Sequence, residues 1–311
     1  MPVTLAILAA GRSSRFGRPK PFEPVGPSGE ALFEYAAYDA IRAGCGRIVF
    51  VTTPEQESAF RARARGRLGT AVGVDTVTQR LDDVPPGFRS PAGRDAPWGT
   101  GHAVLSVGRS VRGPCVVLNA DDFYGPQIIA RMVRRLRDAR TTGDPSHFLA
   151  GYRLADTPVS NGGGVNRAIC EVDASLQLDR LEEVRDIRPV EAGFAGTDEN
   201  GRRRALKPED LCSMNLWAFQ PSIFEKLRGA FERFHARVKD PLLDEFLLSS
   251  AIGRLVETGR ARVRVAAAEQ RAFGITFPED RDAVVSGIAT AVARGDYPTD
   301  LGAWFERGAC N

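Results

Sequence analysis

The chain opens with a short, largely apolar segment that runs directly into a glycine- and arginine-rich segment. Val3–Ala9 is typical of a strand that is buried on both faces of a sheet. Gly11 ends this run, and the ten residues that follow contain a second glycine, two serines, three arginines and a lysine. Backbone N–H groups of such a loop can bind phosphate oxygens, since glycine lets the main chain approach closely. We therefore expect a phosphate-binding loop at the edge of a sheet, where ligands bind in open α/β folds.

Two cations of this loop suit phosphate chemistry. Arg15 can neutralise a leaving pyrophosphate, and Lys20 can bridge to the phosphate under attack. The loop contains neither the G-x-x-x-x-G-K-[ST] pattern of a Walker A motif nor G-x-G-x-x-G. Taken alone, it leaves kinases and dinucleotide-binding proteins open as alternatives.

Strand and helix patterns alternate over the first half of the chain. The expected strands are Val3–Ala9, Arg47–Thr52, Ala71–Thr78 and Cys115–Leu118, and the expected helices are Ala31–Ala43, Glu55–Arg65, His102–Val107 and Ile128–Arg140. This alternation predicts an α/β fold, with a Rossmann-like, doubly wound, mostly parallel sheet and helices on both faces.

From Phe148 the pattern changes to strands separated by polar and glycine-rich loops, which predicts an elaborated C-terminal α+β portion. The expected strands are Phe148–Arg153, Ala168–Val172, Leu178–Val184, Ser213–Phe219 and Ala261–Ala267, and the expected helices are Ser222–Phe234, Leu242–Thr258 and Glu279–Ala293. We expect the polar stretches Leu81–Asp95 and Glu191–Pro208 to be mobile loops over a site.

The composition excludes several classes of protein. The chain has 42 Lys and Arg residues against 39 Asp and Glu. The basic residues are spread along the chain, so we expect no basic patch that would bind nucleic acid. Five scattered cysteines without a C-x-x-C pair favour a reduced, cytoplasmic protein over a disulfide scaffold or zinc module. The apolar N-terminal run is too short for a transmembrane helix and lacks the basic region of a signal peptide. We expect no membrane partner, and the sequence leaves homo-oligomerisation open.

Two further motifs place small residues and carboxylates where elements are expected to end or begin. Gly99 and Thr100 stand before a predicted helix, where small residues let a flat ligand lie against the backbone. The apolar run Val116–Leu118 leads into Asp121 and Asp122, and carboxylates at the carboxyl edge of a sheet suit Mg²⁺. Helix capping is the alternative role for Asp122.

The first motif resembles the signature of the sugar-1-phosphate nucleotidyltransferases, also called nucleotide-sugar pyrophosphorylases. Leu8–Pro21 contains L-A-A-G-x-x-S-R-x-G-x-x-K-P, against the family's G-x-G-T/S-R-L-x-P-x-x-x-K-P, with Arg12-Ser13-Ser14 in place of x-Gly-Thr. Pro97–Val104 is similar to the family's P-x-G-T-A-x-A-V, although Gly101 replaces an alanine. Asp121-Asp122 matches the family's G-D-N/D. The resemblance implies the nucleotide-diphospho-sugar transferase fold.

The resemblance also implies roles on the nucleotide side. Arg15, Lys20 and Asp121 would be catalytic, and Gln79 would read the edge of the base. Asp121 and Asp280 would bind Mg²⁺, the expected cofactor; the tryptophan and glycine of the family's W-x-D-x-G are missing around Asp280, where a helix cap is the alternative. The implied nucleotide-binding residues are Leu8, Ala9, Ala10, Gly11, Arg12, Ser13, Ser14, Gln79, Gly99 and Thr100.

On the acceptor side the resemblance is thinner. Gly164 aligns with a glycine that backs the sugar, and Glu182 and Glu183 resemble a glutamate that binds sugar hydroxyls. The implied acceptor-binding residues are Asn119, Asp122, Gly164, Glu182 and Asn215. Val184 replaces the lysine that follows the glutamate in the family, so Arg185, Lys207 or Lys239 is expected to supply the missing cation.

The expected function is transfer of a nucleoside monophosphate from an NTP to a sugar 1-phosphate or similar phosphorylated small molecule, with release of pyrophosphate. We expect a single domain over residues 1–311, with a nucleotide-binding half (1–145), an acceptor-binding half (146–260) and a C-terminal strand and helix that complete the site (261–311). Two alternatives remain: a non-catalytic relative that binds a nucleotide sugar, and a glycosyltransferase of the same sheet topology.

Overall fold

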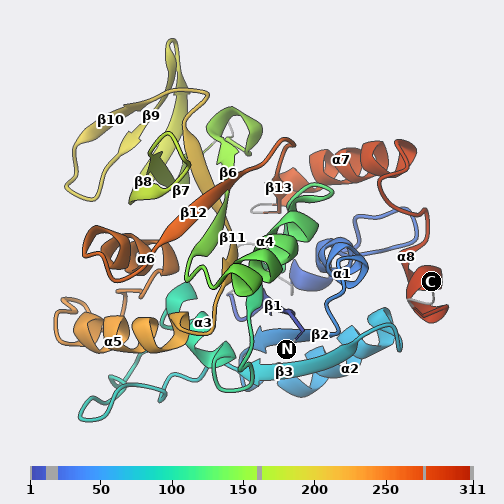
Figure 1. Ribbon diagram of the computed structural model, residues 1–311, viewed down its shortest axis with the longest axis horizontal. Helices are drawn as coiled ribbons and strands as arrows, with labels where there is room; N and C mark the ends of the chain where they lie inside the picture. The colour runs from blue at the N-terminus through green and yellow to red at the C-terminus, as the bar shows by residue number, and fades with distance from the viewer. Residues whose placement is uncertain (1, 12–19, 160–162, 276–277, 309–311) are drawn as a thin grey trace.

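The structure is a computed structural model that describes residues 2–11, 20–159, 163–275 and 278–308, and it confirms the expected α/β fold (Figure 1). Every strand and helix expected before residue 145 is present. The elements of this half are β1 (Thr4–Leu8), η1 (Lys20–Phe22), α1 (Leu32–Arg42), β2 (Arg47–Thr52), α2 (Glu57–Leu68), β3 (Gly73–Thr78), α3 (Thr100–Val107), β4 (Cys115–Asn119), β5 (Asp122–Phe123) and α4 (Ile128–Thr142).

The second half contains more strands than helices before residue 220 and mainly helices after it. Its elements are β6 (His147–Arg153), η2 (Leu154–Asp156), β7 (Val165–Val172), β8 (Leu178–Val190), β9 (Gly193–Thr197), β10 (Arg203–Leu206), β11 (Leu211–Phe219), α5 (Ile223–His235), α6 (Leu248–Glu257), β12 (Val263–Ala267), β13 (Phe273–Gly274), η3 (Pro278–Asp280), α7 (Arg281–Ala293) and α8 (Leu301–Glu306).

Among the described residues, eleven strands form one mixed sheet in the order β10-β9-β8-β7-β11-β4-β1-β2-β3, with β6 paired to β11 and β12 paired to β6. Strands β4, β1, β2 and β3 run parallel. Strand β11 is antiparallel to β4 and to β7, and the sheet continues antiparallel from there to β10. In Figure 1 the parallel part lies at the bottom and the β7–β10 ribbon rises at the top left.

Strand β1 is buried on both faces, as its apolar sequence predicts. Leu5 and Ile7 belong to one core, which α1, α2, α4, α7 and α8 cover. Ala6 and Leu8 belong to a second core, which α3, α5 and α6 cover. Complete burial of each Leu or Ile side chain stabilises the fold by about 1.5–3 kcal/mol. The carboxyl end of β1 is thereby held rigidly at the point where the glycine-rich loop begins.

Two expectations about loops and helices are wrong. The stretch Glu191–Pro208 is not a loop, because it contains β9 and β10. These strands lie at the edge of the sheet, where Phe194 pairs with Leu206 over a small core and Thr197, Arg203 and Ala205 face solvent. A polar edge strand has too few apolar positions to give an alternating pattern.

The helix expected over Leu242–Thr258 begins only at Leu248. The carboxylate of Asp240 accepts hydrogen bonds from the backbone N–H groups of Leu242 (3.0 Å) and Leu243 (3.2 Å). This local turn competes with helix formation. The short elements β5, β13 and α8 were not expected either, and the two strands have only two residues each, which leaves no periodicity to detect.

Cys45, Cys115, Cys170 and Cys212 are free and buried, so no disulfide joins them within the described residues. Of the helices that the structure describes, none is long and apolar enough to cross a membrane.

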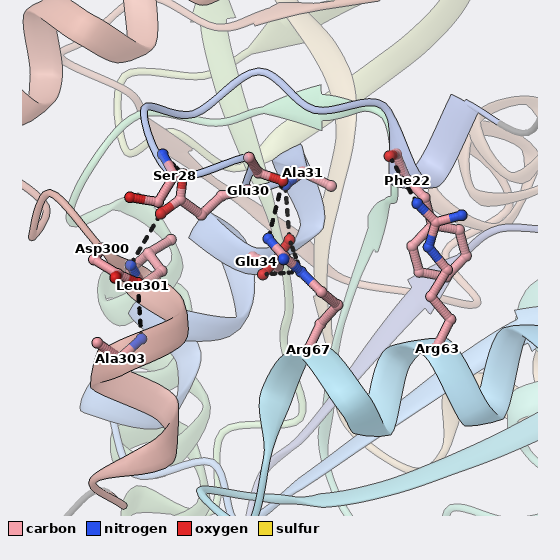
Figure 2. A network of polar contacts seen from close by, with 11 residues as sticks. Phe22, Ser28, Glu30, Ala31, Glu34, Arg63, Arg67, Asp300, Leu301 and Ala303 are labelled. Carbon is pink, nitrogen blue, oxygen red and sulfur yellow. Dashed lines mark hydrogen bonds and ion pairs between the residues drawn. The ribbon is translucent and has the colours of Figure 1, made fainter.

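The chain that follows the glycine-rich loop is clamped onto α1, α2 and α8 (Figure 2). Phe22 packs against Phe33 and Phe60, with ring centroids 5.5 and 4.5 Å apart. The buried carboxylate of Glu34 accepts from the N–H of Ala31 (2.7 Å) and from the Nε of Arg67 (3.0 Å).

The same segment is tied to α8 and α2 by backbone groups. Glu30, also fully buried, accepts from the N–H of Leu301 at the start of α8 (3.1 Å). Arg67 donates to the carbonyl of Gly29 (2.9 Å). These contacts fix the course of the chain after the glycine-rich loop, because separating a buried charged group from its partner costs free energy.

We predict that Arg67→Ala lowers the free energy of unfolding by about 1–3 kcal/mol, because the buried Glu34 carboxylate loses its cation. Arg63→Ala, on the same helix, is the matched control: Arg63 lies over the Phe22 ring at 4.3 Å and is exposed, so its loss costs less than about 1 kcal/mol. Urea denaturation of the two variants measures the difference, and equal losses would contradict the clamp.

Candidate active site

A cleft of about 380 Å³ lies where the carboxyl end of β4 meets β7, β8, β11 and the start of α6. Five of the predicted site residues line it: Thr100, Asn119, Asp121, Asp122 and Asn215. Arg167, Glu183, Ser213 and Ser249 line it as well. The nucleotide-side turn after β4 and the predicted acceptor strand β11 therefore share one cavity.

A directed chain of hydrogen bonds runs from Trp217 to Asp122 along the floor of the cleft. Trp217 Nε1 donates to Asn215 Oδ1 (2.9 Å), Asn215 Nδ2 donates to Asn119 Oδ1 (2.7 Å), and Asn119 Nδ2 donates to Asp122 Oδ2 (2.9 Å). The indole N–H can only donate, so it sets the orientation of both amides. Every donor in the chain consequently points toward the Asp122 carboxylate.

The conformation of Asn215 makes this chain possible. Its φ is +61°, in the left-handed region that asparagine tolerates better than most residues. The pairing of β11 with β6 is irregular between Ser213 and Trp217, so Asn215 leaves the ladder. The hydroxyl of Ser213 accepts from the Asn215 N–H (3.0 Å), which satisfies the backbone group that the irregularity releases.

The turn that carries Asp121 and Asp122 is paired with the C-terminal segment. Gly274 lies opposite Asp122 in the β13–β5 pair, and the carbonyl of Asp121 accepts from Ile275 N–H (3.1 Å). A Cβ on Gly274 would lie 2.0 Å from Asp122 Oδ1, so only glycine fits. Asp280 follows six residues later at the start of α7, where its side chain makes no capping hydrogen bond.

Oxygen donors gather at this end of β4. Asp121 and Asp122 supply carboxylates, and among the described side chains no group of three or more His, Cys, Asp or Glu residues could hold a metal ion. A Mg²⁺ ion typically takes one or two carboxylates and completes its shell with water and substrate phosphates. The donor set therefore fits a Mg²⁺ ion that arrives with a nucleotide. The role of Asp280 as a second metal ligand stays a prediction.

On the nucleotide side, Gln79 is buried beside the start of α3. Its Nε2 donates to Gly99 O (2.9 Å) and lies 3.2 Å from His102 Nδ1. His102 Nε2 is 3.0 Å from the carbonyl of Asp83, which can only accept, so Nδ1 is the unprotonated nitrogen that accepts from Gln79. His102 thus orients the Gln79 amide and leaves its Oε1 turned away from these partners.

Gly99 and Gly101 let the start of α3 pack against Phe246. Gly101 N–H donates to Phe246 O (2.9 Å), and a Cβ on Gly101 would lie 2.6 Å from the Phe246 ring. Gly99 has φ +96° and a Cβ there would meet Phe246 O at 2.8 Å. The aromatic ring explains why glycine stands at 101 where the family motif has alanine. Thr100 Oγ1 accepts from the N–H of Leu248 at the start of α6 (3.0 Å).

The predicted phosphate loop is described only at its two ends. Leu8, Ala9 and Ala10 are buried at the end of β1, and Gly11 is exposed. Arg12, Ser13, Ser14 and Arg15 lie outside the described residues. Lys20 begins η1, and its side chain is also outside the described part.

The two adjacent glutamates of β8 have different surroundings. Glu182 is 5% exposed, does not line the cleft, and pairs with Arg180 (3.1 Å) and Arg204. Glu183 lines the cleft and accepts a hydrogen bond from Ser249. Burial raises the pKa of Glu183, and the Ser249 hydrogen bond opposes this shift. The structure therefore places Glu183, not the predicted Glu182, beside the acceptor strand.

The remaining residues predicted for the acceptor side do not line the cleft. Gly164 packs against Asp186, where a Cβ would lie 1.9 Å from the carboxylate, and it stands two residues before Asn166, which does line the cleft. None of the three expected cations, Arg185, Lys207 and Lys239, lines the cleft within the described residues.

Two buried histidines make the stability of the fold depend on pH. Burial lowers the pKa of His102 and of His147 from 6.5 to about 4. Between these values the unfolded chain binds more protons than the folded protein, so acid favours unfolding. The stability that each neutral histidine contributes is complete above pH 6.5 and is lost as the pH falls toward 4.

We predict that His102 and His147 each contribute an acid-destabilising slope of at most about 1.4 kcal/mol per pH unit between pH 6.5 and 4, which the raised pKa of Asp39, about 7, opposes over the same range. Urea denaturation at several pH values measures it. His147→Gln should remove one of the two histidine contributions, so that acidification destabilises this variant less than the wild type. An unchanged slope in this variant would show that other groups carry the pH dependence.

Comparisons with known proteins agree with this geometry. Residues 5–151 match the family model of the MobA-like NTP transferase domain. A crystal structure of UDP-glucose pyrophosphorylase complexed with UDP-glucose has the same fold, with a TM-score of 0.60 and 17% sequence identity over 93% of this chain and 99% of that chain. No curated protein sequence matches the chain significantly. Residues 5–151 are thus similar to the MobA-like NTP transferase domain, and the chain as a whole shares the fold of UDP-glucose pyrophosphorylase.

Proposed function

We propose that the protein transfers a nucleoside monophosphate from an NTP to a sugar 1-phosphate, or a similar phosphorylated small molecule, and releases pyrophosphate. The observation that carries this proposal is the shared cleft, in which the Asp121–Asp122 turn faces the acceptor strand β11. The neighbouring pyrophosphorylase was solved with UDP-glucose, which makes UTP and glucose 1-phosphate the first pair to test.

In the proposed reaction an oxygen of the acceptor phosphate attacks the α-phosphorus of the NTP in line, and the bond to pyrophosphate breaks. A Mg²⁺ ion held by Asp121 would neutralise phosphate charge. Arg15 is assigned to the leaving pyrophosphate and Lys20 to the α-phosphoryl group. The protein itself forms no covalent bond, so its contribution is positioning and charge stabilisation.

The rigid floor of the cleft supports this division of roles. The side-chain amides of Asn119 and Asn215 both take part in the series of hydrogen bonds that ends on Asp122. Donors directed at a carboxylate stabilise its charged form and hold it in place. Asp122 is thereby assigned to orientation beside the metal, and Glu183 to the hydroxyl groups of the acceptor.

The discriminating experiment is a matrix of NTPs against sugar 1-phosphates, with pyrophosphate release measured with and without Mg²⁺. A nucleotidyltransferase releases pyrophosphate only when NTP, acceptor and Mg²⁺ are all present. A non-catalytic relative releases none with any pair. A glycosyltransferase instead consumes the nucleotide sugar and leaves the NTP intact.

We predict that Asp121→Ala and Lys20→Ala each lower turnover by about 100-fold or more, because metal binding and α-phosphoryl charge stabilisation are lost. Asp179→Ala, at an exposed position of β8, is the control and should retain turnover. Steady-state pyrophosphate release measures all three. Near-normal turnover in either of the first two variants would count against the assigned roles.

We predict that Trp217→Phe raises the Mg²⁺ concentration needed for half-maximal rate by about tenfold, because Asn215 loses the donor that orients the chain toward Asp122. Trp98→Phe loses a comparable buried hydrogen bond, from Nε1 to Leu81 O (2.9 Å), elsewhere in the same core. The two variants should lose similar stability in urea, and only the first should change the Mg²⁺ requirement. A Mg²⁺ requirement shifted equally in both would argue for general loosening of the fold.

A further inference from the structure

A second cavity, of about 520 Å³, lies between helices α5 and α6, at the left of Figure 1. Its lining comes from the second half of α5, from residues 237–247, and from α6 with the residues that follow it. Of these described residues, only Leu247 also lines the cleft. The α5–α6 cavity is therefore a separate space that shares one wall with the candidate active site.

The floor of the α5–α6 cavity is apolar. Phe246, Ala251 and Leu255 are buried in the core that α3, α5 and α6 cover, and Phe234 packs against the same core. The rings of Phe234 and Phe246 lie together, with centroids 5.6 Å apart. An apolar ring or chain placed on this floor would remove apolar surface from water, which favours binding.

The rim of the same cavity is rich in cations. All of them are exposed, and within the described residues no ion pair joins any of them to a carboxylate. These cations are Arg233, Arg237, Lys239, Arg254 and Arg260. A guanidinium group suits phosphate and carboxylate groups, because its planar fork can donate to two oxygens at once.

The carboxylates of the lining, Asp244, Glu245 and Glu257, do not cancel this charge. Asp244 accepts hydrogen bonds from the backbone N–H groups of Lys239 (3.0 Å) and Asp240 (3.1 Å). Asp244 and Glu245 also act on the charge of Arg94, which is buried and does not line the cavity. Five cations thus face three carboxylates, two of which already compensate Arg94, so the cavity suits an anion.

The shared wall ties the α5–α6 cavity to the predicted nucleotide-binding residues at the start of α3. Phe246 N–H donates to Trp98 O (2.7 Å), and Phe246 O accepts from Gly101 N–H (2.9 Å). The next N–H but one, that of Leu248, donates to Thr100 Oγ1 (3.0 Å). A ligand that contacts the Phe246 ring therefore acts on the segment that positions Thr100.

We propose that the α5–α6 cavity is a second binding site, for an organic anion that carries an apolar ring or chain. The anionic group lies among the guanidinium groups of Arg233, Arg237 and Arg254, and the apolar part covers Phe234 and Phe246. Because Phe246 is bonded to the start of α3, the occupant changes the affinity for the NTP, and the NTP changes the affinity for the occupant. This coupling rests on the proposed function, whereas the binding site does not.

Fluorescence titration of the full chain with 8-anilinonaphthalene-1-sulfonate, an aromatic anion, tests the binding site. Arg237→Gln combined with Arg254→Gln should weaken saturable binding by at least about tenfold. The matched control combines Arg228→Gln with Arg262→Gln, which are exposed and lie outside the cavity, and should bind as the wild type does.

The uncharged analogue N-phenyl-1-naphthylamine has the same rings without the sulfonate and should bind at least about tenfold more weakly. Absence of saturable binding, equal affinities of the wild type and the Arg237/Arg254 variant, or equal binding of the uncharged analogue overturns the proposal.

The coupling has its own readout, in the assay of pyrophosphate release. Saturating 8-anilinonaphthalene-1-sulfonate should change the KM for the NTP by about fivefold or more in the wild type, and leave it unchanged in the Arg237/Arg254 variant. Arginine-dependent binding of the probe without turnover on any substrate pair would refute the proposed function and keep the binding site. Turnover with the same NTP KM in the presence of the probe would keep the proposed function and overturn the coupling.

Discussion

The hydrogen-bond chain from Trp217 to Asp122 links the hydrophobic core to the chemistry of the cleft. Trp217 is fully buried, and its indole can only donate, so the orientation of two amides follows from the packing of one ring. The chain crosses from β11 to β4, the two strands where the antiparallel and parallel parts of the sheet meet. A carboxylate at the end of β4 is thereby aligned before any ligand binds, which is the form of preorganisation that phosphoryl transfer needs.

Segments far apart in the sequence surround this chain and hold the two walls of the cleft together. Gly274 of β13 pairs with Asp122, and Arg67, Glu34 and Glu30 clamp the chain that leaves the phosphate loop (Figure 2). The start of α6 is tied to the start of α3 through Thr100. The C-terminal strand and helices thus brace both the Asp121–Asp122 turn and the segment that follows the glycine-rich loop.

Much of the nucleotide half could be predicted from the sequence, because its signals are local. A doubly buried strand such as β1 is apolar at every position after Thr4, and Asp121 comes two residues after the end of another such strand, β4. The acceptor half depends on pairings between distant segments. Glu182 and Glu183 differ by one position in β8, and a strand sends adjacent side chains to opposite faces, so the sequence alone does not tell which one enters the cleft.

The position of Arg167 also depends on a pairing between segments that are separate in the sequence. Its place opposite Val184 follows from the β7–β8 register, which is irregular next to it between Val165 and Arg167. The sequence offered Arg185, Lys207 and Lys239 as the missing cation, and none of these lines the cleft within the described residues, whereas Arg167 does. The role of His102 was also hidden, since its partners Gln79 and Asp83 lie about twenty residues away in a segment without regular structure.

The central claim is that an acceptor phosphate oxygen attacks the α-phosphorus of the NTP directly. Acceptor phosphate labelled with oxygen-18, incubated with unlabelled NTP and the enzyme, tests this claim by mass spectrometry of both products. The account predicts that the nucleotide-linked product retains all of the label and that the released pyrophosphate carries none. Label in the pyrophosphate, or its loss to solvent from the nucleotide-linked product, would contradict it.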